Sequence, residues 1–206
     1  MAPDDEVCAA FEAAADWYLS VLTRIPADAW DGPGLGSWTV KELAAHTARA
    51  FVTIETYLAE APNAAEVHDP VTYFQIALAD SATHAGVAER GKREAANLGD
   101  DPAASIAIIA ERVRGIVATT PGDALTRSAV GGMRFSDYLM TRTVELTVHT
   151  CDICQAIGLD EQPPEVAAAL TFSVLGGLAA IHPRRREVLR ALTGRVSLPD
   201  GCNVLG

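Results

Sequence analysis

The sequence is poor in lysine, in aromatic residues and in cysteine. Only Lys41 and Lys92 are lysines, and 16 basic residues against 27 acidic ones give a net charge of −11. Nonspecific binding to nucleic acid or to an anionic membrane needs a basic surface. The composition therefore argues against both nucleic acid and membrane as partners.

No targeting signal is recognisable in the sequence, and long apolar runs are scarce. Residues 1–12 have neither a basic start nor a continuous apolar run, so we expect no signal peptide and a cytoplasmic protein. The most apolar stretch, residues 166–181, is short for a membrane span and contains Thr171 and Ser173. We expect a buried helix there.

The 4 cysteines do not form a disulfide framework in a chain of this length. Cys151 and Cys154 form a CxxC pattern, but it falls inside a helical pattern and has no second pair to complete a structural zinc site. We interpret this pair as ordinary buried thiols.

The low aromatic content of 6% and the abundant alanine favour closely packed helices over a sheet. A length of 206 residues suits one core rather than two. We therefore predict a single all-α domain over residues 1–206, with a bundle at about 5–182 and a short C-terminal helix and tail at 183–206.

The spacing of apolar residues and the helix-ending signals place the helices along the chain. They are predicted at 4–24, from near Trp38 to about 61, 70–97, 102–119, 136–157, 163–182 and 184–192. Thr39 and Glu42 match a capping box, Ser136 is the expected cap of the long helix, and Gly158 ends that helix. A short extended piece is expected at 125–130.

A polar stripe runs along the helix predicted at 136–157. Its members are spaced four, three, four and three residues apart and fall on one face: Tyr138, Arg142, Glu145, His149 and Asp152. Apolar residues flank the stripe, so we predict that it faces inward. A buried Glu145 and His149 would be costly unless paired, and a divalent metal is a partner for both, since side chains at i and i+4 can reach one ion.

His46 is the candidate for a third ligand, because it lies among apolar residues two turns into a different helix. A His, Glu, His set with positions left for water or substrate is typical of a catalytic zinc site. Two simpler interpretations stay open: Glu145 and His149 on a solvated helix face, and a core cluster in which the three residues satisfy one another. His68 and His84 are interpreted as surface residues.

Two segments carry a family resemblance, SWTVKELAAHTARA at 37–50 and YLMTRTVELTVHTCDICQAIGL at 138–159. Together they resemble the N-terminal domain of mycothiol-dependent maleylpyruvate isomerases, within the DinB-like superfamily of metal-dependent helical bundles. The resemblance implies a DinB-like four-helix bundle with additional C-terminal helices. It also implies a zinc ion held by His46, Glu145 and His149.

The resemblance further implies a small-molecule thiol, mycothiol, as cosubstrate, activated by the metal to attack an electrophilic substrate. The reaction would be that of a transferase or an isomerase. Arg142 and Asp152 are the candidate catalytic residues. Arg142 would pair with Glu145 or bind a carboxylate, and Asp152 would accept a hydrogen bond from a ligand imidazole or from Arg142, or simply lie on the surface.

Family members with the complete isomerase architecture continue into a separate C-terminal α/β domain. Few residues follow Pro183, so we expect the chain to keep the metal-bearing bundle and to omit that domain. A noncatalytic metal-binding bundle, acting as a stress-related sensor or assembly subunit, is therefore the alternative function. A homodimer is left open.

Overall fold

The computed structural model describes residues 3–79, 91–198 and 200–205. Its elements are α1 (Pro3–Leu22), α2 (Val40–Leu58), α3 (Pro70–Ala79), α5 (Pro102–Thr119), β1 (Leu125–Ser128), β2 (Gly131–Arg134), α6 (Phe135–Ala156), α7 (Glu165–Ile181) and α8 (Arg185–Leu192). Residues 91–97 are also helical. The predicted all-α class is confirmed.

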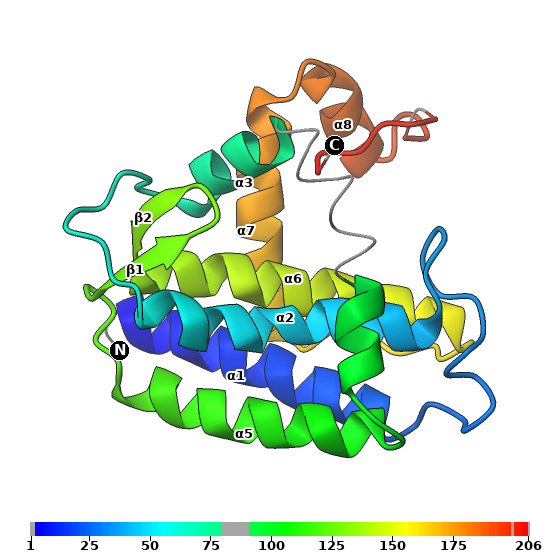
Figure 1. Ribbon diagram of the computed structural model, residues 1–206. Coiled ribbons are helices and arrows are strands. Elements are labelled where there is room, and N and C mark those ends of the chain that lie inside the picture. Colours follow the sequence, from blue (N-terminus) through cyan, green and yellow to red (C-terminus); the bar gives the residue numbers. More distant parts are fainter. Residues whose placement is uncertain (1–2, 80–90, 199, 206) are drawn as a thin grey trace.

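A bundle of α1, α2, α5 and α6 forms the body of the molecule (Figure 1). In it α1 and α6 run in one direction, whereas α2 and α5 run in the other (Figure 1). The helix α7 packs across α1 and α6, and α3 packs on α6 and α7. The two C-terminal helices α7 and α8 are thus additions to the bundle.

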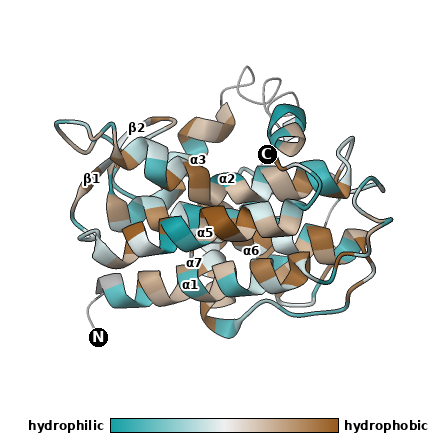
Figure 2. Cartoon of the chain, turned by 60° about the horizontal axis from the view of Figure 1, so that its bottom comes forward, coloured by the Kyte–Doolittle hydropathy of each residue, from teal (hydrophilic) through white to brown (hydrophobic). Residues whose placement is uncertain are grey.

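The core is built from apolar residues at helical spacing and from buried alanines. On α1 and α2 the buried alanines include Ala14, Ala15, Ala44, Ala45 and Ala48. Such small side chains let neighbouring helices approach closely. The Tyr18 hydroxyl donates a hydrogen bond to the Ala44 carbonyl at 2.6 Å, which joins α1 to α2. Apolar and polar stretches alternate along α1 and α5, as their one-sided burial requires (Figure 2).

The helix α6 is enclosed on several sides, because α1, α2, α3 and α7 all pack on it. Its buried Thr143 and Thr150 hydroxyls donate to the carbonyls of Leu139 and Leu146, four residues earlier. These polar side chains are therefore satisfied within the helix and need no outside partner.

Local sequence signals predicted the ends of some helices correctly, whereas for α6 the predicted cap is wrong. The capping box of Thr39 and Glu42 is present, and Gly158 has a φ of +70° after the end of α6. Ser136, in contrast, does not cap α6: the helix begins at Phe135, and the backbone N–H of Ser136 donates to the Gly122 carbonyl. The preceding loop supplies the acceptor that a capping side chain would have provided.

The extended piece predicted at 125–130 is one strand of a hairpin. β1 pairs with β2 in antiparallel register, with Leu125 opposite Arg134. A Cβ atom at Gly132 would lie 2.2 Å from the Ala64 carbonyl oxygen, and the N–H groups of Glu66 and Val67 donate to the Gly132 carbonyl. A glycine is needed there because the loop before α3 presses directly on the strand.

Other expectations about single segments have mixed outcomes. Residues 70–79 and 91–97 of the helix predicted at 70–97 are helical, but the two pieces run in different directions and do not form one straight helix (Figure 1). Residues 80–90, with His84, lie outside the described residues. Cys154 is buried as expected, whereas Cys151 is exposed, because the buried faces of α6 at this end carry Thr150, Ile153 and Cys154 instead. Within the described ranges, no helix combines the length and apolarity of a membrane span.

Removal of the α2 cap tests how much this helix start contributes to stability. Thr39→Ala deletes the hydroxyl that accepts a hydrogen bond from the Glu42 N–H, so we expect a loss of about 1 kcal/mol in the free energy of unfolding. Urea denaturation measures it. Thr56→Ala, at an exposed position on the same helix, is the control, and an equal loss in both variants would contradict the capping role.

Candidate metal centre

The candidate metal centre lies where α2 faces α6. His46 comes from the second turn of α2, and Glu145 and His149 come from successive turns of α6. Their candidate ligand atoms all lie within 4.8 Å of one another. The two imidazole rings are edge to face, with centroids 5.0 Å apart. The structure thus brings together residues from two separate parts of the sequence.

His149 is held from both sides by acids of its own helix. Its Nε2 lies 3.2 Å from the Glu145 carboxylate, and its Nδ1 lies 3.0 Å from the Asp152 carboxylate. A ligand histidine typically donates its second ring N–H to a carboxylate, which fixes the orientation of the ring. Asp152 therefore accepts a hydrogen bond from an imidazole, which is one of the two positions expected for it from the sequence.

His46 is positioned by packing rather than by hydrogen bonding. The ring of Trp38 lies against it, with centroids 4.6 Å apart. Its Nδ1 is buried and has no hydrogen-bond partner among the described residues. An unsatisfied buried nitrogen is costly, so the three residues do not fully satisfy one another.

The cluster fits a divalent metal ion. Its donors are two imidazoles and a carboxylate, the ligand types of catalytic zinc sites. Two ligand atoms on one tetrahedral zinc ion lie roughly 3.4 Å apart. Only small side-chain movements would therefore bring the three ligand atoms onto one ion. The buried Nδ1 of His46, which has no hydrogen-bond partner among the described residues, also fits a metal ligand.

The charges of the cluster are strongly coupled. Burial, and then the charge of His149, lower the pKa of His46 to about 4. Burial also acts to lower the pKa of His149, but hydrogen bonds to Asp152 and Glu145 outweigh it and raise this pKa to about 9. Burial acts to raise the pKa of Glu145, yet the hydrogen bond to His149 and the charge of Arg142 hold it well below its usual value. Without metal, the protonated His149 supplies the positive charge beside Glu145.

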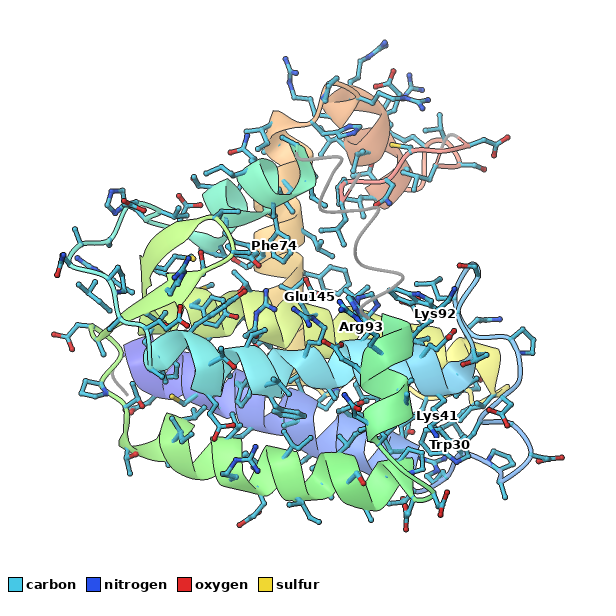
Figure 3. The ribbon with its side chains drawn as sticks, viewed as in Figure 1. Trp30, Lys41, Phe74, Lys92, Arg93 and Glu145 are labelled. Atoms are coloured by element: carbon cyan, nitrogen blue, oxygen red, sulfur yellow. The ribbon has the colours of Figure 1, made fainter. Side chains whose placement is uncertain are left out.

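The polar stripe of α6 does face inward, as predicted. Tyr138 and Arg142 are buried, and Glu145, His149 and Asp152 are partly buried. An open cavity of about 360 Å³ lies next to the stripe, and His46, Arg142, Glu145 and His149 help to line it. Glu145 of α6 and Phe74 of α3 point into the same space (Figure 3).

Arg142 does not form the ion pair with Glu145 that the spacing on α6 allowed. Its Nε donates to the Thr141 hydroxyl at 3.0 Å, and an Nη donates to the Tyr73 hydroxyl at 3.0 Å. Its guanidinium also lies over the ring of Tyr138, 4.9 Å from the centroid. Neutral groups of α6 itself and of α3 take the place of the expected carboxylate.

The aromatic wall of the cavity was not anticipated. Tyr57 of α2, with Tyr73 and Phe74 of α3, lines it. Arg49 also lines the cavity and pairs with Glu94 from the helical segment at 91–97. No spacing rule links α3 to α6, so only the packing of these helices could reveal the contact.

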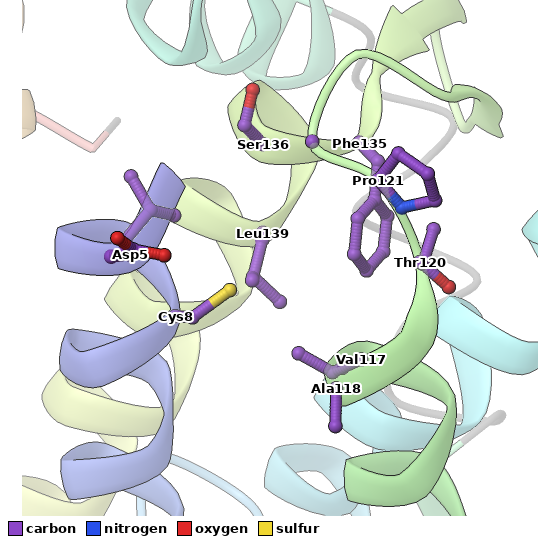
Figure 4. A pocket seen from close by; sticks show the side chains of 11 residues that line it. Asp5, Cys8, Val117, Ala118, Thr120, Pro121, Phe135, Ser136 and Leu139 are labelled. Carbon is purple, nitrogen blue, oxygen red and sulfur yellow. The ribbon is translucent and has the colours of Figure 1, made fainter. Parts of the chain in front are cut away.

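A second cavity, of about 410 Å³, lies at the end of the bundle where α5 ends and α6 begins (Figure 4). Its lining includes Cys8, Thr120 and Ser136. None of the predicted site residues is among the residues that line it.

The helical bundle and the cluster between α2 and α6 define a domain of the DinB-like type. The family model of the mycothiol maleylpyruvate isomerase N-terminal domain matches residues 11–154, and the chain belongs to this family. The family is associated with mycothiol and with metal binding. The matched region contains His46, Glu145, His149 and Asp152. Comparisons with curated proteins and with solved structures gave no match.

The raised pKa of His149 predicts how metal affinity depends on pH. A metal ion must displace the proton that His149 holds below about pH 9, so affinity rises as pH rises. We expect about a tenfold gain per pH unit between pH 6 and 8, and a plateau above the pKa. Competition with a chelator of known affinity measures it.

Asp152→Asn provides a second test of this prediction, because it removes a hydrogen bond that raises the pKa of His149. The plateau should then begin at lower pH. A metal affinity that stays constant between pH 6 and 8 in the unaltered protein would show that His149 is already neutral there.

Proposed function

We propose that the protein is a metal-dependent enzyme that uses a small-molecule thiol, with mycothiol as the thiol and zinc as the metal. It would act as a transferase or isomerase on an electrophilic substrate. The observation that carries the proposal is the convergence of His46, Glu145 and His149 on one side of an open cavity. A site of purely structural zinc would have its ligands closed around the ion.

The residues of the chain have distinct tasks in this proposal. His46, Glu145 and His149 would hold the ion, and Asp152 would keep the His149 ring in register through its Nδ1. When bound, zinc lowers the pKa of a thiol so that thiolate is available near neutral pH. The cavity next to the cluster gives the thiol and the electrophile a place to meet.

Two outcomes of the thiolate attack are consistent with this arrangement. In a transferase the sulfur forms a bond to the electrophilic carbon, a leaving group departs, and the adduct is the product. In an isomerase the sulfur adds to a double bond, the new single bond rotates, and the thiol leaves again. Both require the same metal site and the same cavity.

Metal binding is tested by substitution of the candidate ligands. We expect about one equivalent of zinc per chain, and nearly none in His46→Ala or His149→Ala, because each loses one of three donors. Elemental analysis after zinc reconstitution measures it. His68→Ala, at an exposed position, should keep its zinc.

Chelation should also lower the melting temperature of the unaltered protein, because a ligand that binds only the folded state stabilises it. An interpretation in which the cluster merely satisfies itself predicts no change. A full zinc content in both histidine variants would overturn the proposed ligand set.

Catalysis is tested with mycothiol and monochlorobimane. The sulfur displaces chloride, a proton is released, and the conjugate fluoresces. We expect zinc-dependent turnover that His149→Ala abolishes and His68→Ala preserves. Persistent inactivity with several thiols and electrophiles, in protein that carries zinc, would favour the noncatalytic alternative, a metal-binding sensor or assembly subunit.

Asp152→Asn separates positioning of a ligand from ligation itself. The amide keeps the size of the side chain but weakens the hydrogen bond to His149 Nδ1. Above the pKa of His149, where protons no longer compete with the metal, we therefore expect zinc affinity to fall roughly 10- to 100-fold. A chelator competition measures it. Asp160→Asn, at an exposed position beyond α6, is the control, and a similar fall in both variants would contradict the positioning role.

A further inference from the structure

The helix α7 is apolar on the side that faces solvent as well as on the side that faces the bundle. Its buried side lies where α7 packs against α1, α3 and α6. The opposite side is exposed, and we call it the α7 outer face. Its members lie within about 80° of one another around the helix axis: Glu165, Ala169, Phe172, Gly176 and Ala180. Glu165, in the first turn, is the one charged residue of α7.

An apolar outer face is unusual for a helix at the surface. Such a helix normally carries charged and polar residues toward water, and a helix that is apolar all round is normally covered. The sequence predicts a buried helix over residues 166–181, but the chain buries only one side of it, and Phe172 is 68% exposed. At 17 residues, α7 is short for a membrane span. The outer face therefore lacks a protein neighbour.

Exposed apolar side chains gather in the same C-terminal layer of the molecule. The C-terminal half of α7 extends beyond α6 toward α8 (Figure 1). Most of the large apolar residues that are exposed in the described chain follow residue 165: Val166, Phe172, Ile181, Leu189, Leu192, Val196 and Leu198. A contiguous apolar surface of this kind is typical of a site of protein association.

Two neighbouring glycines of α7 have different surroundings. A Cβ atom at Gly177 would lie 2.5 Å from Val71 Cγ2, so the packing of α3 requires a glycine there. A Cβ atom at Gly176 would meet nothing within 4 Å among the described residues. Glycine inside a helix is destabilising relative to alanine. Close approach of a second helix to the α7 outer face would account for Gly176.

The charges at the two ends of α7 have opposite signs. Glu165 lies in its first turn, and Arg185 and Arg186 begin α8 shortly after α7 ends. All three are exposed, and among the residues that the structure describes none of them forms an ion pair. Two copies of α7 packed antiparallel would bring Glu165 of each copy toward Arg185 and Arg186 of the other. A parallel pair would bring like charges together.

We propose that the α7 outer face is the interface of a homodimer, in which two copies of α7 pack antiparallel across a two-fold axis near Gly176. A two-fold axis makes one surface meet itself, so an acidic end must face a basic end. Gly176 lies about ten residues from both Glu165 and Arg186, so both ends meet at once. In a protein with a net charge of −11, this nearly uncharged face lets two copies approach without repulsion. The interface does not depend on the proposed function.

The oligomeric state of the full chain tests the proposal. Sedimentation equilibrium at micromolar concentration should give twice the mass of one chain. Phe172→Glu should raise the dissociation constant at least roughly 100-fold, because it places like charges against each other across the axis. Ile108→Glu, on α5 (Pro102–Thr119), is the matched control, since Ile108 is also 68% exposed, and it should dimerise as before. Circular dichroism establishes that both variants are folded.

Reversal of the charges tests the antiparallel orientation. Glu165→Arg should weaken the dimer, and so should Arg185→Glu combined with Arg186→Glu. All three substitutions in one chain should restore it. Within one chain these positions lie at opposite ends of a helix roughly 25 Å long, so restoration requires contact between copies. A triple variant that dimerises as weakly as the others would overturn the antiparallel interface.

Gly176→Ala tests the position of the axis. Alanine favours the helix, so this change should raise the melting temperature of the monomeric Phe172→Glu protein. In the unaltered background it should weaken the dimer several-fold, because the added methyl group keeps the helices apart. Gly115→Ala on α5, where a Cβ atom also meets nothing within 4 Å, should leave the dimer unchanged. An unchanged dissociation constant in Gly176→Ala would overturn the crossing at this residue.

Other occupants of the α7 outer face give different results. A chain that stays monomeric at every concentration, or a dimer that Phe172→Glu leaves intact, would overturn the proposal. If the monomer binds vesicles of uncharged lipid and Phe172→Glu abolishes that binding, a lipid surface covers the face and the dimer is wrong. Zinc content should be equal in Phe172→Glu and in the unaltered protein, so failure of the dimer is distinguishable from failure of the metal site.

Discussion

The contact between α2 and α6 is the one on which the site depends. The Tyr138 hydroxyl donates to the Thr53 hydroxyl at 2.7 Å, and His46 meets His149 two turns away along the same interface. Between these points the two helices present polar groups to each other and leave room for a cavity. The rest of the bundle supports this contact: α1 and α7 enclose α6 from other sides, and α5 packs on α2.

The interface separates two kinds of electrostatic environment along a single face of α6. Toward the C-terminal end, Glu145 and Asp152 flank His149 and form an acidic pair that attracts a cation. One turn toward the N-terminal end, Arg142 lies among neutral hydroxyls and rings. The two environments open into the same cavity.

Local signals in the sequence predicted local features well. The Thr39 and Glu42 capping box, the left-handed Gly158 and the inward face of α6 all depend on residues within a few positions of one another. Features made by distant segments were missed or incomplete. The second strand at Gly131 was hidden because glycine pairs usually mark loops, and here Gly132 is required by the loop at 64–67.

The same distinction applies to the site. The spacing of Glu145 and His149 could be interpreted from one helix, and the apolar neighbours of His46 singled it out as the third candidate. The Tyr73 hydroxyl that accepts a hydrogen bond from Arg142, however, comes from α3, whose position no helical period encodes. The centre also joins an early helix to a late one, roughly a hundred residues apart. An ion bound there would act as a crosslink that closes a long loop, and loop closure restricts the unfolded chain. Metal supply would then influence not only chemistry but also how long the folded bundle survives.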